Sequence, residues 1–106
     1  MNKKSLYKVK EELLAMRRSP QGRKPHDLEA IAKQLGRKRD TTKGKEPTYV
    51  REKDPELSPP LSIPAHGSKE LKTGTARNII DALLDDVSDW EIYLEELEDD
   101  NENEID

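Results

Sequence analysis

The chain has 106 residues, of which 40% are charged and 31% hydrophobic, with a mean hydropathy of -1.06. A chain this short and polar has room for one small domain, and part of it is expected to lie outside the hydrophobic core. It contains no cysteine and two separated histidines, so we expect no disulfide, no bound metal and no cofactor. No apolar run is long enough for a signal-peptide core or a membrane span, which favours a cytoplasmic protein without membrane contact.

The two halves of the chain carry opposite charge. Residues 1–53 contain 16 Lys/Arg and 7 Asp/Glu, a net charge of +9, whereas residues 54–106 contain 3 and 16, a net charge of -13. A basic segment attracts polyanions such as RNA, and an acidic segment either repels nucleic acid or covers a basic face of its own chain. Charged runs of this kind are equally typical of solvated surfaces.

Two helices are predicted in the amino-terminal third. Apolar side chains recur at helical spacing over residues 6–16, the helix is expected to stop at Ser19-Pro20, and residues 21–25 form a basic connector. Asp27 is placed to cap a second helix that Gly36 ends. The apolar face of that helix consists of Leu28, Ile31, Ala32 and Leu35.

The middle of the chain favours strands. Residues 37–42 have weak strand character, residues 43–47 contain a turn, and residues 48–51 are the best strand candidate because they are β-branched and aromatic. We expect these to form a hairpin. After a Pro-containing loop, residues 61–63 form a short edge strand that Pro64 closes.

The carboxyl-terminal third predicts a helix with a broad apolar face over residues 76–87, capped by Thr75. A capping box from Ser88 to Glu91 indicates a new helix start, whereas Trp90, Leu94 and Leu97 continue the same apolar stripe. One long helix and two shorter ones both remain open. The apolar stripes of this region and of residues 6–16 are expected to pack on each other or on the sheet, or to bind a partner protein.

A dense motif occupies residues 63–80. A predicted strand ends in Pro-x-His, Lys-Glu-Leu follows, and Gly-Thr opens a helix with an arginine one turn inside. This pattern resembles the C-terminal half of HicA-type toxins of bacterial toxin–antitoxin pairs. The matching positions are Pro64, His66, Lys69, Glu70, Leu71, Gly74, Thr75 and Arg77.

The resemblance implies an α+β fold, a small double-stranded-RNA-binding-like α-β-β-β-α domain over residues 26–87. An N-terminal helix and basic linker (residues 1–25) then precede it, and a helical extension (88–97) and a disordered acidic tail (98–106) follow. The resemblance also implies a metal-independent endoribonuclease that binds and cleaves mRNA and is neutralised by a HicB-type antitoxin.

The chain departs from the family at the catalytic histidine. In HicA-type toxins this histidine lies in a Gly-Ser-His-x-x-aromatic pattern, and aligning Gly44 and Tyr49 with it places Glu46 at the histidine and Lys45 at the serine. A carboxylate acts as a base in RNA cleavage when desolvation raises its pKa. Glu46 and His66 are therefore candidate acid–base groups, and Tyr49 is a candidate to stack on a base or donate a proton.

Each of these residues also has a structural interpretation. Glu46 with Pro47 can simply shape the hairpin turn, His66 can satisfy the backbone of a loop, and His26 can be a partial cap or a solvated residue. A catalytically silent RNA-binding or protein-interaction module is therefore the alternative function. In either case the candidate RNA-binding cations are Lys43, Lys45, Arg51, Lys69 and Arg77.

Overall fold

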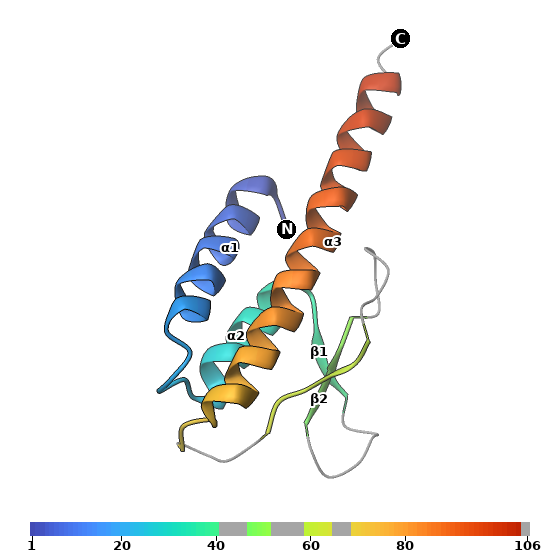
Figure 1. Ribbon diagram of the computed structural model, residues 1–106. Helices are drawn as coiled ribbons and strands as arrows, with labels where there is room; N and C mark the ends of the chain where they lie inside the picture. The colour runs from blue at the N-terminus through green and yellow to red at the C-terminus, as the bar shows by residue number, and fades with distance from the viewer. Residues whose placement is uncertain (41–46, 52–58, 65–68, 105–106) are drawn as a thin grey trace.

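The computed structural model describes the backbone of residues 1–40, 47–51, 59–64 and 69–104. These residues form an α+β fold with three helices and one antiparallel sheet of strand order β1-β2-β3 (Figure 1). The elements in chain order are α1 (Lys3–Arg18), α2 (Pro25–Gln34), β1 (Lys38–Asp40), β2 (Thr48–Val50), β3 (Leu61–Ser62) and α3 (Thr73–Glu104). The α+β class and the predicted order of helix, hairpin, strand and helix are confirmed.

The first two helices begin at polar caps. Asn2 precedes α1, and its side-chain oxygen accepts a hydrogen bond from the backbone N–H of Ser5 at 2.8 Å. The prediction that Asp27 caps α2 was wrong by three residues, because the cap is Lys24 and Pro25 already occupies the first helical position. Asp27 lies inside the first turn and accepts a hydrogen bond from the backbone N–H of Lys24 at 3.0 Å.

Gly36 ends the second helix as predicted. Its φ of +91° lies in the left-handed region that glycine adopts without strain. The N–H of Gly36 bonds to the carbonyl of Lys33, and the N–H of Arg37 bonds to the carbonyl of Ala32, both at 3.0 Å. This is a Schellman turn, and it brings Arg37 directly to the start of β1.

The sheet register decides which side chains reach the core. Arg39 pairs with Tyr49, and Tyr49 pairs with Leu61. Because paired residues of antiparallel strands point to the same face, Tyr49 and Leu61 share one face of the sheet. Tyr49 is buried there and Leu61 is half-buried, packed against a core to which all three helices contribute.

The third helix is continuous. It runs from Thr73 to Glu104 without a break at residue 88, so the sequence from residue 73 to residue 97 forms one helix rather than two. The hydroxyl of Ser88 donates back to the carbonyl of Leu84 at 3.4 Å, as it would inside a helix. Trp90 continues the apolar stripe, and its indole N–H donates to the carbonyl of Leu35 at 2.8 Å.

Helix α1 lies antiparallel to α3 and belongs to the core (Figure 1). The apolar stripe of α1 is buried. Among the described residues, three ion pairs link α1 to α3 at the edges of this contact. The pairs are Lys3–Glu98 at 2.6 Å, Lys10–Glu91 at 3.3 Å and Arg17–Asp81 at 2.7 Å. The basic first helix and the acidic last helix are therefore matched along their length.

A buried ion pair joins the sheet to α3. The guanidinium of Arg37 binds both carboxylate oxygens of Asp86, at 2.6 and 2.9 Å, and its side chain is 1% exposed. The same guanidinium donates to the backbone carbonyls of Tyr49 at 2.8 Å and Pro59 at 3.2 Å. Because an arginine at this depth needs all its N–H groups satisfied, these contacts fix β2, the approach to β3 and α3 relative to one another.

Within the described residues, no helix is both long and apolar enough to cross a membrane.

Removing one partner of the buried pair is expected to destabilise the fold strongly. Asp86→Asn leaves the Arg37 charge buried without its counter-ion, which costs about 3–5 kcal/mol in the free energy of unfolding. The matched control is Asp81→Asn, which removes the solvent-exposed pair with Arg17 and costs less than about 1 kcal/mol. Urea unfolding of both variants measures the difference, and equal losses would contradict a structural role for Arg37.

Candidate functional site

Four of the predicted site residues lie outside the described part of the chain. They are Lys43, Lys45 and Glu46 in the connection between β1 and β2, and His66 between β3 and α3. The strands on either side of the first connection are paired, since Asp40 lies opposite Thr48. The two strands of the predicted hairpin are therefore paired as expected. The acid–base candidates Glu46 and His66 follow β1 and β3 in the sequence.

Tyr49 is buried in the middle of β2, with 2% of its surface exposed. Burial raises the pKa of its hydroxyl to about 12, helped by a hydrogen bond to Glu29 and by the charge of that carboxylate, while Arg39 acts in the opposite direction. The hydroxyl donates to a carboxylate on α2 and stays protonated at neutral pH. In this position the ring is part of the core and does not face solvent, where a nucleobase would stack.

Arg51 is also buried, with its side chain 1% exposed. One of its terminal nitrogens lies 3.5 Å from a carboxylate oxygen of Asp89, and its guanidinium carbon lies 5.9 Å from the centre of the Trp90 ring. A Cβ at Gly36 would lie 3.4 Å from the Arg51 side chain and 3.6 Å from Trp90, so this glycine lets the turn pack closely over both. The arginine thus connects the end of β2 with α3.

Lys69 and Arg77 are the two predicted RNA-binding residues that the structure leaves exposed. Lys69 lines a pocket of about 280 Å³ where the chain enters α3, together with Pro64, Glu70, Leu71, Lys72 and Thr75. Arg77 lies one turn into α3. The amino-terminal end of a helix carries a partial positive charge, so these cations and the helix act in the same direction on a phosphate.

Two further exposed cations lie on β1, and the sequence analysis did not single them out. Lys38 and Arg39 occupy an outer strand of the sheet, and both are exposed. The sequence signal that could have indicated these cations is the basic run that follows Gly36, Arg37-Lys38-Arg39. Arg37 precedes the strand and is buried, whereas Lys38 and Arg39 lie within β1 and are exposed.

The remaining histidine has a local contact. His26 is largely exposed, and its Nε2 lies 3.3 Å from a carboxylate oxygen of Asp27 at the start of α2. Among the described residues, no group of three or more His, Cys, Asp or Glu side chains is arranged to hold a metal ion. The described residues of the candidate site are therefore exposed cations, and the acid–base candidates Glu46 and His66 lie outside the described part of the chain.

No protein-family model, curated protein or solved structure matches this chain.

The raised pKa of Tyr49 predicts a specific loss of stability in alkali. The unfolded chain releases this proton near pH 10, and the folded protein retains it until about pH 12. The contribution is therefore fully present below pH 10 and is lost as the pH rises to about 12, by about 2–3 kcal/mol. Denaturant unfolding as a function of pH measures this loss, and Tyr49→Phe is expected to remove it. An identical decline in the variant would contradict the assignment.

Proposed function

We propose that this chain is a HicA-like toxin, an RNA-binding endoribonuclease that cleaves mRNA in the cytoplasm and is neutralised by a HicB-type antitoxin. The observation that carries the proposal is the order α2-β1-β2-β3-α3 with an antiparallel sheet. That order is compatible with the α-β-β-β-α layout of the family. In the sequence, the Pro-x-His, Lys-Glu-Leu and Gly-Thr motif follows β3 and reaches into the first turn of α3, which supports the proposal.

The electrostatics of the described surface support RNA as the ligand. Lys38 and Arg39 on β1, and Lys69 and Arg77 at the start of α3, are exposed cations. Their charge favours a phosphate backbone irrespective of base sequence. In this proposal Lys43 and Lys45 add further cations.

The proposed chemistry is attack of a ribose 2'-hydroxyl on the adjacent phosphate. Glu46 takes the hydroxyl proton, His66 protonates the leaving oxygen, and the cations stabilise the charge that develops on the phosphate. Tyr49 is buried and has a raised pKa, so it supports the strand that carries this site instead of exchanging protons with RNA.

The silent RNA-binding or protein-interaction module stays as the second candidate, because a specific observation favours it. Glu46 stands where the family has a catalytic histidine, and Tyr49, the other candidate proton donor on the hairpin, is buried beneath the helices. Such a protein would keep the cations that bind RNA while leaving the RNA intact.

Expression in a bacterial cell separates the two candidates. The wild-type chain is expected to stop growth and to fragment mRNA, and Glu46→Ala and His66→Ala are each expected to reduce cleavage by about 100-fold or more, the usual contribution of an acid–base group. Growth curves and RNA integrity after induction provide the measurement. The matched control is Glu12→Ala, which changes an exposed glutamate on α1 and is expected to behave as wild type.

Two outcomes with the purified wild-type protein would contradict the ribonuclease function. If purified wild-type protein binds RNA and leaves it uncut, the silent module is the correct function. If it neither binds nor cuts RNA, the toxin and the silent RNA-binding module both fail, and the protein-interaction module is left.

RNA affinity is expected to depend on the exposed cations. Reversing Lys69 and Arg77 to glutamate weakens binding to unrelated RNA sequences alike, and it lowers the slope of log affinity against log salt by about 0.7 for each single-strand phosphate that the protein no longer neutralises. A salt titration by fluorescence anisotropy measures both quantities. Lys33→Glu, an exposed cation near the end of α2, is the control, and a slope unchanged by the double reversal would contradict the proposed surface.

A further inference from the structure

The basic connector between α1 and α2 is held against the segment that enters α3. The backbone N–H of Leu71 donates to the carbonyl of Arg23 at 2.8 Å, and a Cβ at Gly22 would lie 4.0 Å from a carboxylate oxygen of Glu70. Leu71 is buried, and it also lines the pocket of about 280 Å³ at the start of α3. The connector therefore adjoins this pocket, and Figure 1 shows the end of α1, the connector and the start of α3 at one end of the molecule.

Both sides of this contact are basic. Residues 17–27 contain 4 Lys/Arg and 1 Asp, and residues 69–77 contain 3 Lys/Arg and 1 Glu. The acidic member of the first segment is engaged locally, since Asp27 accepts a hydrogen bond from the backbone N–H of Lys24. Two segments of net positive charge thus lie side by side, and a bound polyanion relieves their mutual repulsion.

Most of these cations have no carboxylate partner in the described part of the chain. Arg17 is paired with Asp81 at 2.7 Å. Arg18, Arg23 and Lys72 have no ion pair with any described residue. Because Arg18 and Lys72 are exposed and Arg23 is half-buried, their charge is accessible to a ligand from solvent.

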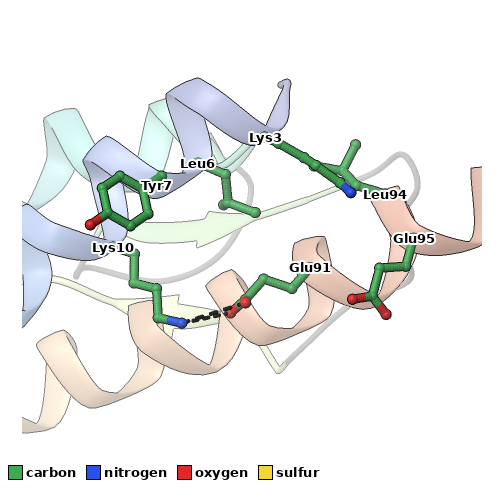
Figure 2. A pocket seen from close by; sticks show the side chains of 7 residues that line it. All are labelled: Lys3, Leu6, Tyr7, Lys10, Glu91, Leu94 and Glu95. Atoms are coloured by element: carbon green, nitrogen blue, oxygen red, sulfur yellow. Dashed lines mark hydrogen bonds and ion pairs between the residues drawn. The ribbon is translucent and has the colours of Figure 1, made fainter. Parts of the chain in front are cut away.

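The opposite end of α1 differs, because α3 supplies carboxylates there. Lys3 binds Glu98 at 2.6 Å, and Figure 2 shows Lys10 reaching across to Glu91, at 3.3 Å. Residues 78–106 contain no Lys, Arg or His, and the carboxyl-terminal half of α3 lies beside the amino-terminal end of α1 (Figure 1). A polyanion is therefore attracted to the connector end of the molecule and repelled from the other end.

We propose that the connector extends the RNA-binding surface and that Arg18, Arg23 and Lys72 contact phosphates of the strand held by Lys69 and Arg77. The inference rests on the proposed RNA binding at the start of α3. It adds the end of α1 and the connector, which lie outside the α-β-β-β-α layout, to the residues that hold the substrate. Phosphate contacts of this kind add affinity and position the strand without reading its bases.

Neutralising the two arginines tests the proposal with the full-length chain and a fluorescein-labelled single-stranded RNA. In about 0.15 M salt, Arg18→Gln/Arg23→Gln is expected to weaken binding by about 10-fold and to lower the slope of log affinity against log salt by about 1.4, because two single-strand phosphates are no longer neutralised. Fluorescence anisotropy measures both quantities. The matched control is Lys4→Gln/Lys8→Gln, which removes the same charge from exposed positions at the other end of α1 and is expected to change the affinity by less than about twofold.

A measurement on the wild-type chain does not depend on how the variants fold. Lysines are acetylated with a water-soluble reagent, with and without the same RNA, and the modified positions are read by mass spectrometry. Bound RNA is expected to slow the modification of Lys72 and to leave the rates at Lys4 and Lys8 unchanged, since all three side chains are exposed in the free protein.

The failure of this inference is distinguishable from the failure of the proposed function. If Arg18→Gln/Arg23→Gln binds RNA as tightly as the control variant, or RNA leaves Lys72 unprotected, while reversal of Lys69 and Arg77 still weakens binding, the inference is overturned and the RNA site at α3 stands. If the wild-type chain does not bind RNA, both fail together. If poly-glutamate with as many charges as the RNA binds equally tightly, an acidic protein is the partner of this surface and the inference is overturned.

Discussion

The buried ion pair between Arg37 and Asp86 is the contact on which the rest of the structure depends. It joins residues 49 positions apart, and the same guanidinium holds the carbonyls of Tyr49 and Pro59. Charges at this depth are tolerated only when every partner is in place. One side chain, delivered by the Schellman turn at Gly36, therefore fixes the central strand and the long helix together.

The opposite charges of the two chain halves are largely used to build the fold. Acidic side chains of α3 pair with cations of α1 along one side, and with Arg37 and Arg51 near the sheet. This arrangement removes Arg51 from the surface and leaves Lys38, Arg39, Lys69 and Arg77 exposed to a polyanion. It also leaves the distal end of α3 with a surplus of carboxylates.

The sequence predicted most of the fold because apolar periodicity and glycine positions are local signals. It did not decide whether residues 73–97 form one helix or two, because the capping box at Ser88 competes with the apolar stripe through Trp90. In the structure the helix is continuous, and the Trp90 indole donates a hydrogen bond to the distant carbonyl of Leu35. The burial of Arg37 and Arg51 was not predictable, since their partners Asp86 and Asp89 are distant in sequence. The two cations of β1 were missed for a related reason: which of three adjacent basic residues is buried depends on the distant partner Asp86 that binds Arg37.

Arg37 and Arg51 belong to the folded core, and we propose that the exposed cations contact RNA. NMR spectroscopy of the Nε–H groups of both arginines, recorded while single-stranded RNA is added, tests this most directly. We predict that the backbone signals of Lys38, Arg39, Lys69 and Arg77 shift, while the two Nε–H signals keep their positions and their slow exchange with water. A shift of the Arg51 Nε–H signal comparable to those of the exposed residues would contradict the account.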